Sequence, residues 1–223
     1  MSHRAVLAVI AAAMLLAVAT PVAATDPAGN NKYVVSATYV NFTSEHPAAD
    51  GSPVPGTYIS GSVSAFTSPI DPSWDRATVS YQIYAIGEAP DYTRTDLRAG
   101  WGWAYWDEFS VGGSLLFAHV EATVATQECP DPMDETSCVP RERVTLNVTV
   151  NARTDLAVAA TGGSNVEPPI FVEAWHYLDK SRAADSVDGT FAVLGYGTVE
   201  LSQAITDGAI FTSRINSVQV YKP

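Results

Sequence analysis

Strict alternation of apolar and polar residues marks positions 143–151, which read R-V-T-L-N-V-T-V-N. Val144, Leu146, Val148 and Val150 fall on one side of an extended chain, and polar residues fall on the other. A period of two predicts a β-strand with one face in a hydrophobic core and the other in water. The stretch therefore predicts an all-β fold.

The segment at 115–124 has the same pattern. One face is apolar and comprises Leu116, Ala118, Val120, Ala122 and Val124. The opposite face comprises Leu115, Phe117, His119, Glu121 and Thr123. We expect the two segments to pair as neighbouring antiparallel strands of a hairpin.

Further stretches with strand character bring the expected number of strands to about ten. They are 32–44, 57–67, 77–86, 101–109, 156–160, 170–178, 190–201 and 214–221. Stretches rich in glycine, proline and aspartate, such as 45–56 and 161–169, are interpreted as connections between strands. Regular strands with this punctuation favour an antiparallel β-sandwich, of the jelly-roll or an immunoglobulin-like type. No linker-like composition divides residues 25–223, so we expect one domain.

The N-terminal residues have the pattern of a secretory signal peptide. His3 and Arg4 precede an uninterrupted apolar run at 5–19, and small residues at 22–24 offer a cleavage site after Ala24. The run is short for a membrane span. We therefore expect residues 1–24 to be removed and the rest to be secreted to the extracellular space without a membrane anchor.

The charge balance argues against one class of partner. The chain has a net charge of -12, and removal of Arg4 with the signal leaves 11 basic against 24 acidic residues, or -13. A basic surface that could release counterions from a phosphate backbone is not expected, so nucleic acid is an unfavourable partner. No motif for a cofactor is found, and we expect none.

Two cysteines, Cys129 and Cys138, enclose an eight-residue loop before the best-patterned strand. Export to an oxidising compartment predicts that they form a disulfide. Asp131, Asp134 and Glu135 in this loop are oxygen ligands of the kind that Ca²⁺ prefers. A solvated acidic loop is the favoured interpretation, because calcium-loop spacing is lacking and two prolines stiffen the segment.

Aromatic residues are concentrated at 101–109, W-G-W-A-Y-W-D-E-F. On one strand, Trp101, Trp103, Tyr105 and Phe109 would share a face, with Trp106 opposite. Small residues between the large rings indicate that little bulk is wanted behind them. One interpretation is packing in the core; the other is an exposed platform for a ligand. The candidate ligand-binding residues are Trp101, Trp103, Tyr105, Asp107, Trp175 and Tyr177.

Catalytic motifs are sparse. The sequence has no G-x-S-x-G and no S-x-x-K motif, which gives no support to serine hydrolase chemistry. Glu121 and Glu173 would form the carboxylate pair of a glycoside hydrolase if their strands were neighbours, with His119 nearby. We therefore expect a secreted, non-catalytic protein that binds a glycan or an extracellular protein through surface aromatics. The alternatives are a structural or cell-surface-associated protein with buried aromatics and a glycoside-type hydrolase.

Overall fold

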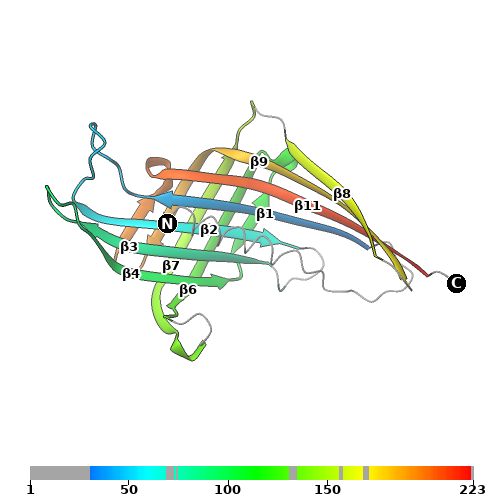
Figure 1. Cartoon of the computed structure of the whole chain (residues 1–223), viewed down its shortest axis with the longest axis horizontal. Helices are drawn as coiled ribbons and strands as arrows, with labels where there is room; N and C mark the ends of the chain where they lie inside the picture. Colours follow the sequence, from blue (N-terminus) through cyan, green and yellow to red (C-terminus); the bar gives the residue numbers. More distant parts are fainter. Residues whose placement is uncertain are drawn as a thin grey trace.

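The computed structural model describes residues 31–68, 73, 75–130, 135–155, 158–167 and 171–221. Over these residues the chain is nearly all β, which confirms the predicted fold class (Figure 1). The strands are β1 Asn31–Thr43, β2 Gly56–Thr67, β3 Arg76–Ile86, β4 Arg94–Ala104, β5 Glu108–Val111, β6 Phe117–Glu128, β7 Val139–Ala152, β8 Ala159–Glu167, β9 Phe171–Val193, β10 Gly197–Glu200 and β11 Ile205–Tyr221. Short 3-10 turns lie at Gly113–Leu115, Glu135–Ser137 and Leu201–Gln203.

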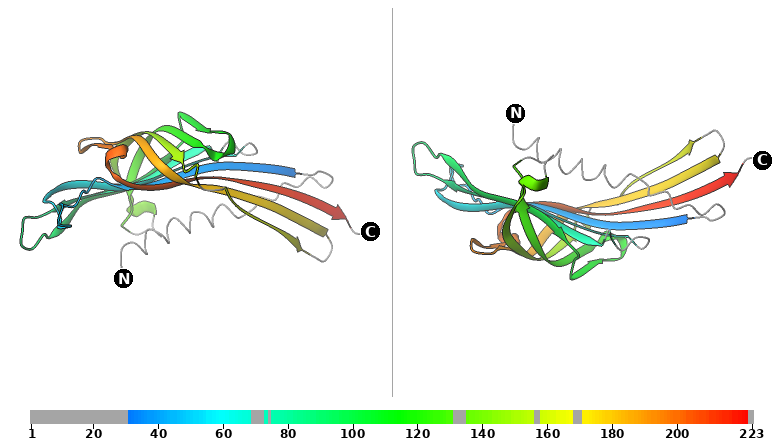
Figure 2. Two further views of the ribbon diagram at one scale, coloured as in Figure 1. Left: turned by 90° about the horizontal axis from the view of Figure 1, so that it is seen from above. Right: turned by 90° about the horizontal axis from the view of Figure 1, so that it is seen from below.

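All the strands belong to one antiparallel sheet of 11 strands. Its main path runs β10-β9-β11-β1-β2-β3-β4-β6-β5, while β7 pairs with both β6 and β9, and β8 pairs with β9. Because β7 pairs with both β6 and β9, the order of paired strands leads from β9 through β11, β1, β2, β3, β4, β6 and β7 back to β9. The sheet is folded over, so that its two layers pack face to face as a sandwich requires, but both layers belong to a single sheet (Figures 1 and 2).

Strand β9 connects the two layers. Its first part pairs with β11 from Phe171 to Ala183, and its second part pairs with β7 from Ala184 to Val193. The sequence predicts two separate strands here, at 170–178 and 190–201, and the polar segment 179–189 belongs to neither. The structure corrects this prediction, because the polar segment keeps its backbone hydrogen bonds by changing partner from one layer to the other.

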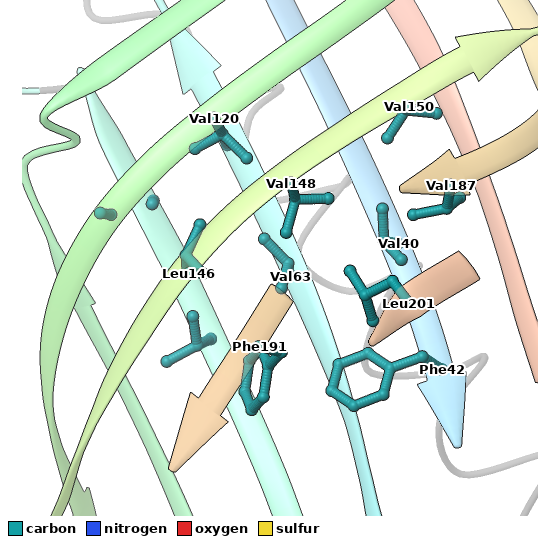
Figure 3. Packing of buried hydrophobic residues seen from close by; sticks show 14 of the residues in the cluster. Val40, Phe42, Val63, Val120, Leu146, Val148, Val150, Val187, Phe191 and Leu201 are labelled. Carbon is teal, nitrogen blue, oxygen red and sulfur yellow. The ribbon is translucent and has the colours of Figure 1, made fainter. Parts of the chain in front are cut away.

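The core lies between the layers. Inward-facing side chains from β1, β2, β3, β6, β7 and β9 form one cluster of buried residues (Figure 3). Phe42 of β1 and Phe191 of β9 meet across the interior with ring centroids 4.7 Å apart. This contact joins strands that are not paired to each other, so it holds the two layers together.

The predicted hairpin of β6 and β7 is confirmed. Val124 pairs with Val144 and Val120 with Val148, and all four side chains are buried. Two positions differ from the prediction: Leu115 is 5% exposed and Leu116 is 45% exposed. The alternation ends there because Gly113–Leu115 forms a 3-10 turn, and β6 starts only at Phe117.

Two other boundaries are corrected by the structure. The predicted strand at 101–109 is two strands, β4 and β5, with an irregular segment between Ala104 and Glu108. The predicted connection at 161–169 is largely strand, because β8 pairs with β9 over Ala159–Glu167. Pairing with a long neighbouring strand overrides the low strand propensity of Gly162 and Gly163.

The disulfide between Cys129 and Cys138 is present, as predicted. It lies between the end of β6 and the start of β7. Arg141 and Glu128 form an ion pair beside it, with 2.6 Å between Nη2 and Oε2. The covalent link and the ion pair therefore fix the same end of the hairpin.

A single-layer extension projects from the two-layer part of the molecule (Figure 2). It is built from β8, the first part of β9, β11 and the first residues of β1, which pair in that order. Strand β2 pairs with β1 only from Ser36 onward, so it ends where the extension begins.

Candidate binding face on strand β4

Three aromatic side chains stand on the outer face of the sheet at the end of β4. Trp101 is 41% exposed, Trp103 is 49% exposed and Tyr105, just after the strand, is 60% exposed. We call these three residues the aromatic face. The sequence left open whether these rings are buried or exposed. The structure places them in solvent.

The inward positions of β4 explain why the rings point outward. Gly100 precedes Trp101, and Gly102 lies between Trp101 and Trp103. Both glycines face the interior, where a Cβ on Gly102 would overlap the carbonyl oxygen of Ala125. A Cβ on Gly100 would meet the ring of Tyr81 at 2.7 Å. Strand β4 thus lies too close to β6 and Tyr81 to carry side chains inward, which leaves the bulky residues on the outer face.

Neighbouring residues hold Trp103 in place. The ring of Tyr105 contacts it edge-on, with centroids 6.1 Å apart. The guanidinium of Arg76 on β3 lies 5.6 Å from the Trp103 ring and 5.0 Å from the Phe66 ring. Edge-to-face and cation–π contacts of this kind stabilise an exposed ring in one orientation. A ligand that stacks on Trp103 would therefore meet a ring that is already positioned.

Trp106 and Phe109 do not belong to the aromatic face. Trp106 is half-buried, its indole Nε1 donates to the carbonyl oxygen of Phe66 at 3.2 Å, and its ring lies 6.0 Å from that of Phe109. Both rings pack against the core cluster. The expected alignment of Phe109 with Trp101 is therefore wrong, because the break after β4 places Phe109 on a separate strand.

A shallow, open depression adjoins the aromatic face. Ser73, Asp75, Tyr105 and Trp106 line it. The carboxylate of Asp75 accepts hydrogen bonds from the Thr67 hydroxyl at 2.6 Å and from the Ser68 backbone at 3.1 Å. Asp75 thus fixes the end of β2 and presents a polar border to the depression.

Short hydroxyl side chains lie beside the two tryptophans on the next two strands. Trp101 is paired with Ser80 and Trp103 with Thr78 on β3, and these pair in turn with Ser62 and Ser64 on β2. We call Ser62, Ser64, Thr78 and Ser80 the hydroxyl strip. The alternating positions Val63 and Val79 are 1% exposed, so the strip faces outward. The hydroxyls of Ser62 and Ser80 are hydrogen-bonded at 2.8 Å.

The other candidate ligand residues are not all placed. Asp107 is exposed in the segment between β4 and β5, and its backbone N donates to the carbonyl oxygen of Glu121 at 2.7 Å. Trp175 and Tyr177 lie in the first part of β9, and their side chains are outside the described residues. In strand order, β11, β1, β2 and β3 separate that part of β9 from β4.

Most of the acidic loop between Cys129 and Cys138 also lies outside the described residues. Asp131 and Asp134 are not among the described residues, nor is the side chain of Glu135. Among the side chains that the structure describes, no three His, Cys, Asp or Glu residues are grouped to hold a metal ion.

The hypothetical carboxylate pair is not assembled as cross-strand neighbours. Glu121 lies opposite Glu108 on β5 and Asn147 on β7, whereas Glu173 lies opposite Gln219 on β11 and Glu167 on β8. His119 does lie near Glu121, with 3.6 Å between Nε2 and Oε1. Its Nδ1 is 2.9 Å from the Thr149 hydroxyl, and the Asn147 side chain donates to Glu121.

A second polar cluster comprises Tyr81 of β3, Arg98 of β4, Thr126 of β6 and Glu142 of β7. The Tyr81 hydroxyl donates to Glu142 at 2.6 Å, the Thr126 hydroxyl donates to the Glu142 backbone carbonyl at 2.5 Å, and Arg98 lies 3.3 Å from the Glu142 carboxylate. Burial, and then the hydrogen bond to Glu142, raise the pKa of Tyr81 from 10.0 to about 12. Burial opposes ionisation of Glu142, but its partners Tyr81 and Arg98 hold its pKa below the ordinary value.

We expect this cluster to make stability fall in alkaline solution. The unfolded chain releases the Tyr81 proton near pH 10, while the folded protein keeps it to about pH 12. Stability from this proton is complete below pH 10 and is lost as the pH rises from 10 to about 12. Urea unfolding of the protein and of Tyr81→Phe across this range checks the prediction. The variant should have the shallower decline, and equal slopes would refute the assignment.

Comparisons with known proteins give little information about this chain. No family model matches the sequence, and no curated protein matches it. One solved structure, the enduracididine biosynthesis enzyme MppR complexed with the condensation product of pyruvate and imidazole 4-carboxaldehyde, aligns with 90% of this chain and 93% of that chain. The identity is 13% and the TM-score is 0.24, so the alignment indicates neither a shared fold nor a shared function.

Among the described residues, no helix has the length and apolar character needed to cross a lipid bilayer.

Arg76 and the hydroxyl strip were not among the site residues predicted from the sequence. The sequences S-V-S at 62–64 and T-V-S at 78–80 signal strands with a polar outer face. That these strands lie next to β4 follows only from the order of the sheet.

Proposed function

We propose that this protein is an exported, non-catalytic β-domain that binds an extracellular ligand, a glycan or a protein, through the aromatic face. The observation that carries the proposal is the exposure of two tryptophans and a tyrosine on consecutive outward positions. Burial of such rings in the core would stabilise the fold, whereas exposure to water does not. Their clustering, with Trp103 in contact with both Arg76 and Tyr105, favours a binding role.

Export is supported by two features. The apolar run at 5–19 has the pattern of a signal peptide. The Cys129–Cys138 disulfide is typical of proteins that fold outside the reducing cytosol. A purely structural role would require the aromatic rings of 101–105 to be buried, and their exposure makes that alternative the weaker one.

Substitution of Trp103 tests the proposal. Trp103→Ala should weaken binding at least about tenfold, because a central tryptophan commonly contributes about 2 kcal/mol or more to an interface. The probes are a panel of cell-wall polysaccharides and the extracellular proteins from a culture of the organism that produces this protein. They are immobilised and exposed to the labelled domain. The unfolding free energy of Trp103→Ala should differ from that of the unmodified protein by less than about 1 kcal/mol, because the ring lies outside the core.

Phe117→Ala is the matched control. Phe117 is 43% exposed, similar to Trp103, but lies on β6 away from the aromatic face. The control should bind as the unmodified protein does. Equal binding by Trp103→Ala, or a large loss of stability on that substitution, would refute the proposed role of the ring.

A further inference from the structure

Two parallel rows of outward-facing residues cross four neighbouring strands, and each row starts at one of the two tryptophans. One row runs from Trp101 through Ser80 and Ser62 to Asn41, and the other from Trp103 through Thr78 and Ser64 to Tyr39. Figure 1 shows β4, β3, β2 and β1 side by side in this order. Three strand spacings separate the ends, which is about 14 Å. The rows therefore form an elongated surface that runs across the strands.

The relief of this surface follows from its side chains. Aromatic residues stand at the β4 end and at Tyr39, and the short side chains of the hydroxyl strip lie between them. The strip is half-buried although it faces outward, as expected where taller side chains flank short ones. A ligand can therefore lie close to the backbone of β2 and β3 while it contacts the rings at the end.

The rows themselves carry no charged residue in a strongly acidic chain. The rows contain no Asp, Glu, Lys, Arg or His, although the chain has 24 Asp and Glu residues. Burial and the nearby Asp207 raise the pKa of Tyr39, so its phenol is neutral at physiological pH. Charges beside the rows, Arg76 at Trp103 and Asp207 near Tyr39, have opposite signs, so the surface has no single sign of charge that would select an ionised ligand.

We propose that the ligand of the aromatic face is a neutral polysaccharide chain, which lies across β4 to β1 with sugar rings on Trp101 and Trp103 and its hydroxyls on the hydroxyl strip. This inference rests on the proposed function and narrows it. Indole rings pack against the apolar C–H faces of sugars. Serine and threonine hydroxyls donate and accept, as the hydroxyls of a sugar do. A protein interface has a more apolar, closely packed centre, which the strip does not supply.

Obstruction of the strip tests the inference without removal of an aromatic ring. Ser64→Arg places a long charged side chain in the row of Trp103, and Thr145→Arg places the same side chain on the outer face of β7 as a control. Both positions face solvent, so both variants should fold. Thr78→Arg is the second variant for the same row.

The probes are neutral hexasaccharides of glucose, xylose and N-acetylglucosamine, with hexagalacturonate as the anionic comparison, titrated by calorimetry. At least one neutral probe should bind, Ser64→Arg or Thr78→Arg should weaken it at least about tenfold, and Thr145→Arg should not change it. Binding of hexagalacturonate alone, of no hexasaccharide, or of a neutral probe with equal strength to the strip variants would overturn the inference. A protein ligand that depends on Trp103 but not on Ser64 would overturn this inference and leave the proposed function standing.

Discussion

Gly189→Ala should destabilise the protein by at least about 3 kcal/mol, from backbone strain and steric overlap together. Gly189 lies in the second part of β9, paired with Val148 of β7, and has a φ of +107°. Residues with a side chain rarely adopt this backbone conformation. A Cβ at this position would also overlap the carbonyl oxygen of Asn147. The substitution therefore disrupts the pairing that joins the two layers.

Gly195→Ala is the control for Gly189. Gly195 also has a positive φ, +85°, but a Cβ added there would meet no atom within 4 Å beyond its chain neighbours. Its cost should be limited to about 1–2 kcal/mol from backbone conformation. Urea unfolding of both variants gives the comparison. Similar losses in the two variants would contradict the close approach of β9 to β7.

Phe191→Ala should cost about 3–5 kcal/mol, as is usual when a buried aromatic residue is truncated. Phe191 is completely buried and contacts Phe42 from the opposite layer (Figure 3). The loss combines reduced hydrophobic burial with a cavity between the layers, since the neighbouring strands are held by their own hydrogen bonds and collapse only in part.

Leu194→Ala is a matched control for Phe191, since Leu194 lies three residues later and is 71% exposed. Its substitution should change the unfolding free energy by less than about 0.5 kcal/mol. Chemical denaturation measures both. A loss under about 1 kcal/mol for Phe191→Ala would mean that the two layers do not pack through this contact.

The local pattern of the sequence predicted the strands with one wet face. Residues of β6 and β7 alternate strictly, and their pairing follows from adjacency along the chain. Long-range pairing was not predictable in the same way. The polar segment between Leu178 and Thr190 was not predicted to be a strand, yet it continues β9, because its partners change from β11 to β7. Partners so distant in sequence leave no local signal.

The candidate site was also predictable only in part, because some of its features are local in the sequence and others depend on the order of the strands. The glycine between Trp101 and Trp103 indicated that little bulk is tolerated behind the rings, and the interior position of Gly102 agrees with this. Whether the rings are exposed depends on which face of β4 lies against the opposite layer. That in turn depends on how the sheet closes. The hydroxyl strip depends on the order β4-β3-β2, which the spacing of residues does not encode.

The most direct test of the aromatic face as a binding surface is the response of individual indole N–H signals to ligand. Three tryptophans at the end of β4 provide their own internal comparison, because Trp101 and Trp103 are exposed, whereas the indole of Trp106 is bonded to Phe66. NMR titration of the ¹⁵N-labelled protein with a bound neutral hexasaccharide should shift the signals of Trp101 and Trp103 and leave that of Trp106 nearly unchanged. Binding that leaves both exposed indoles unshifted would contradict the account.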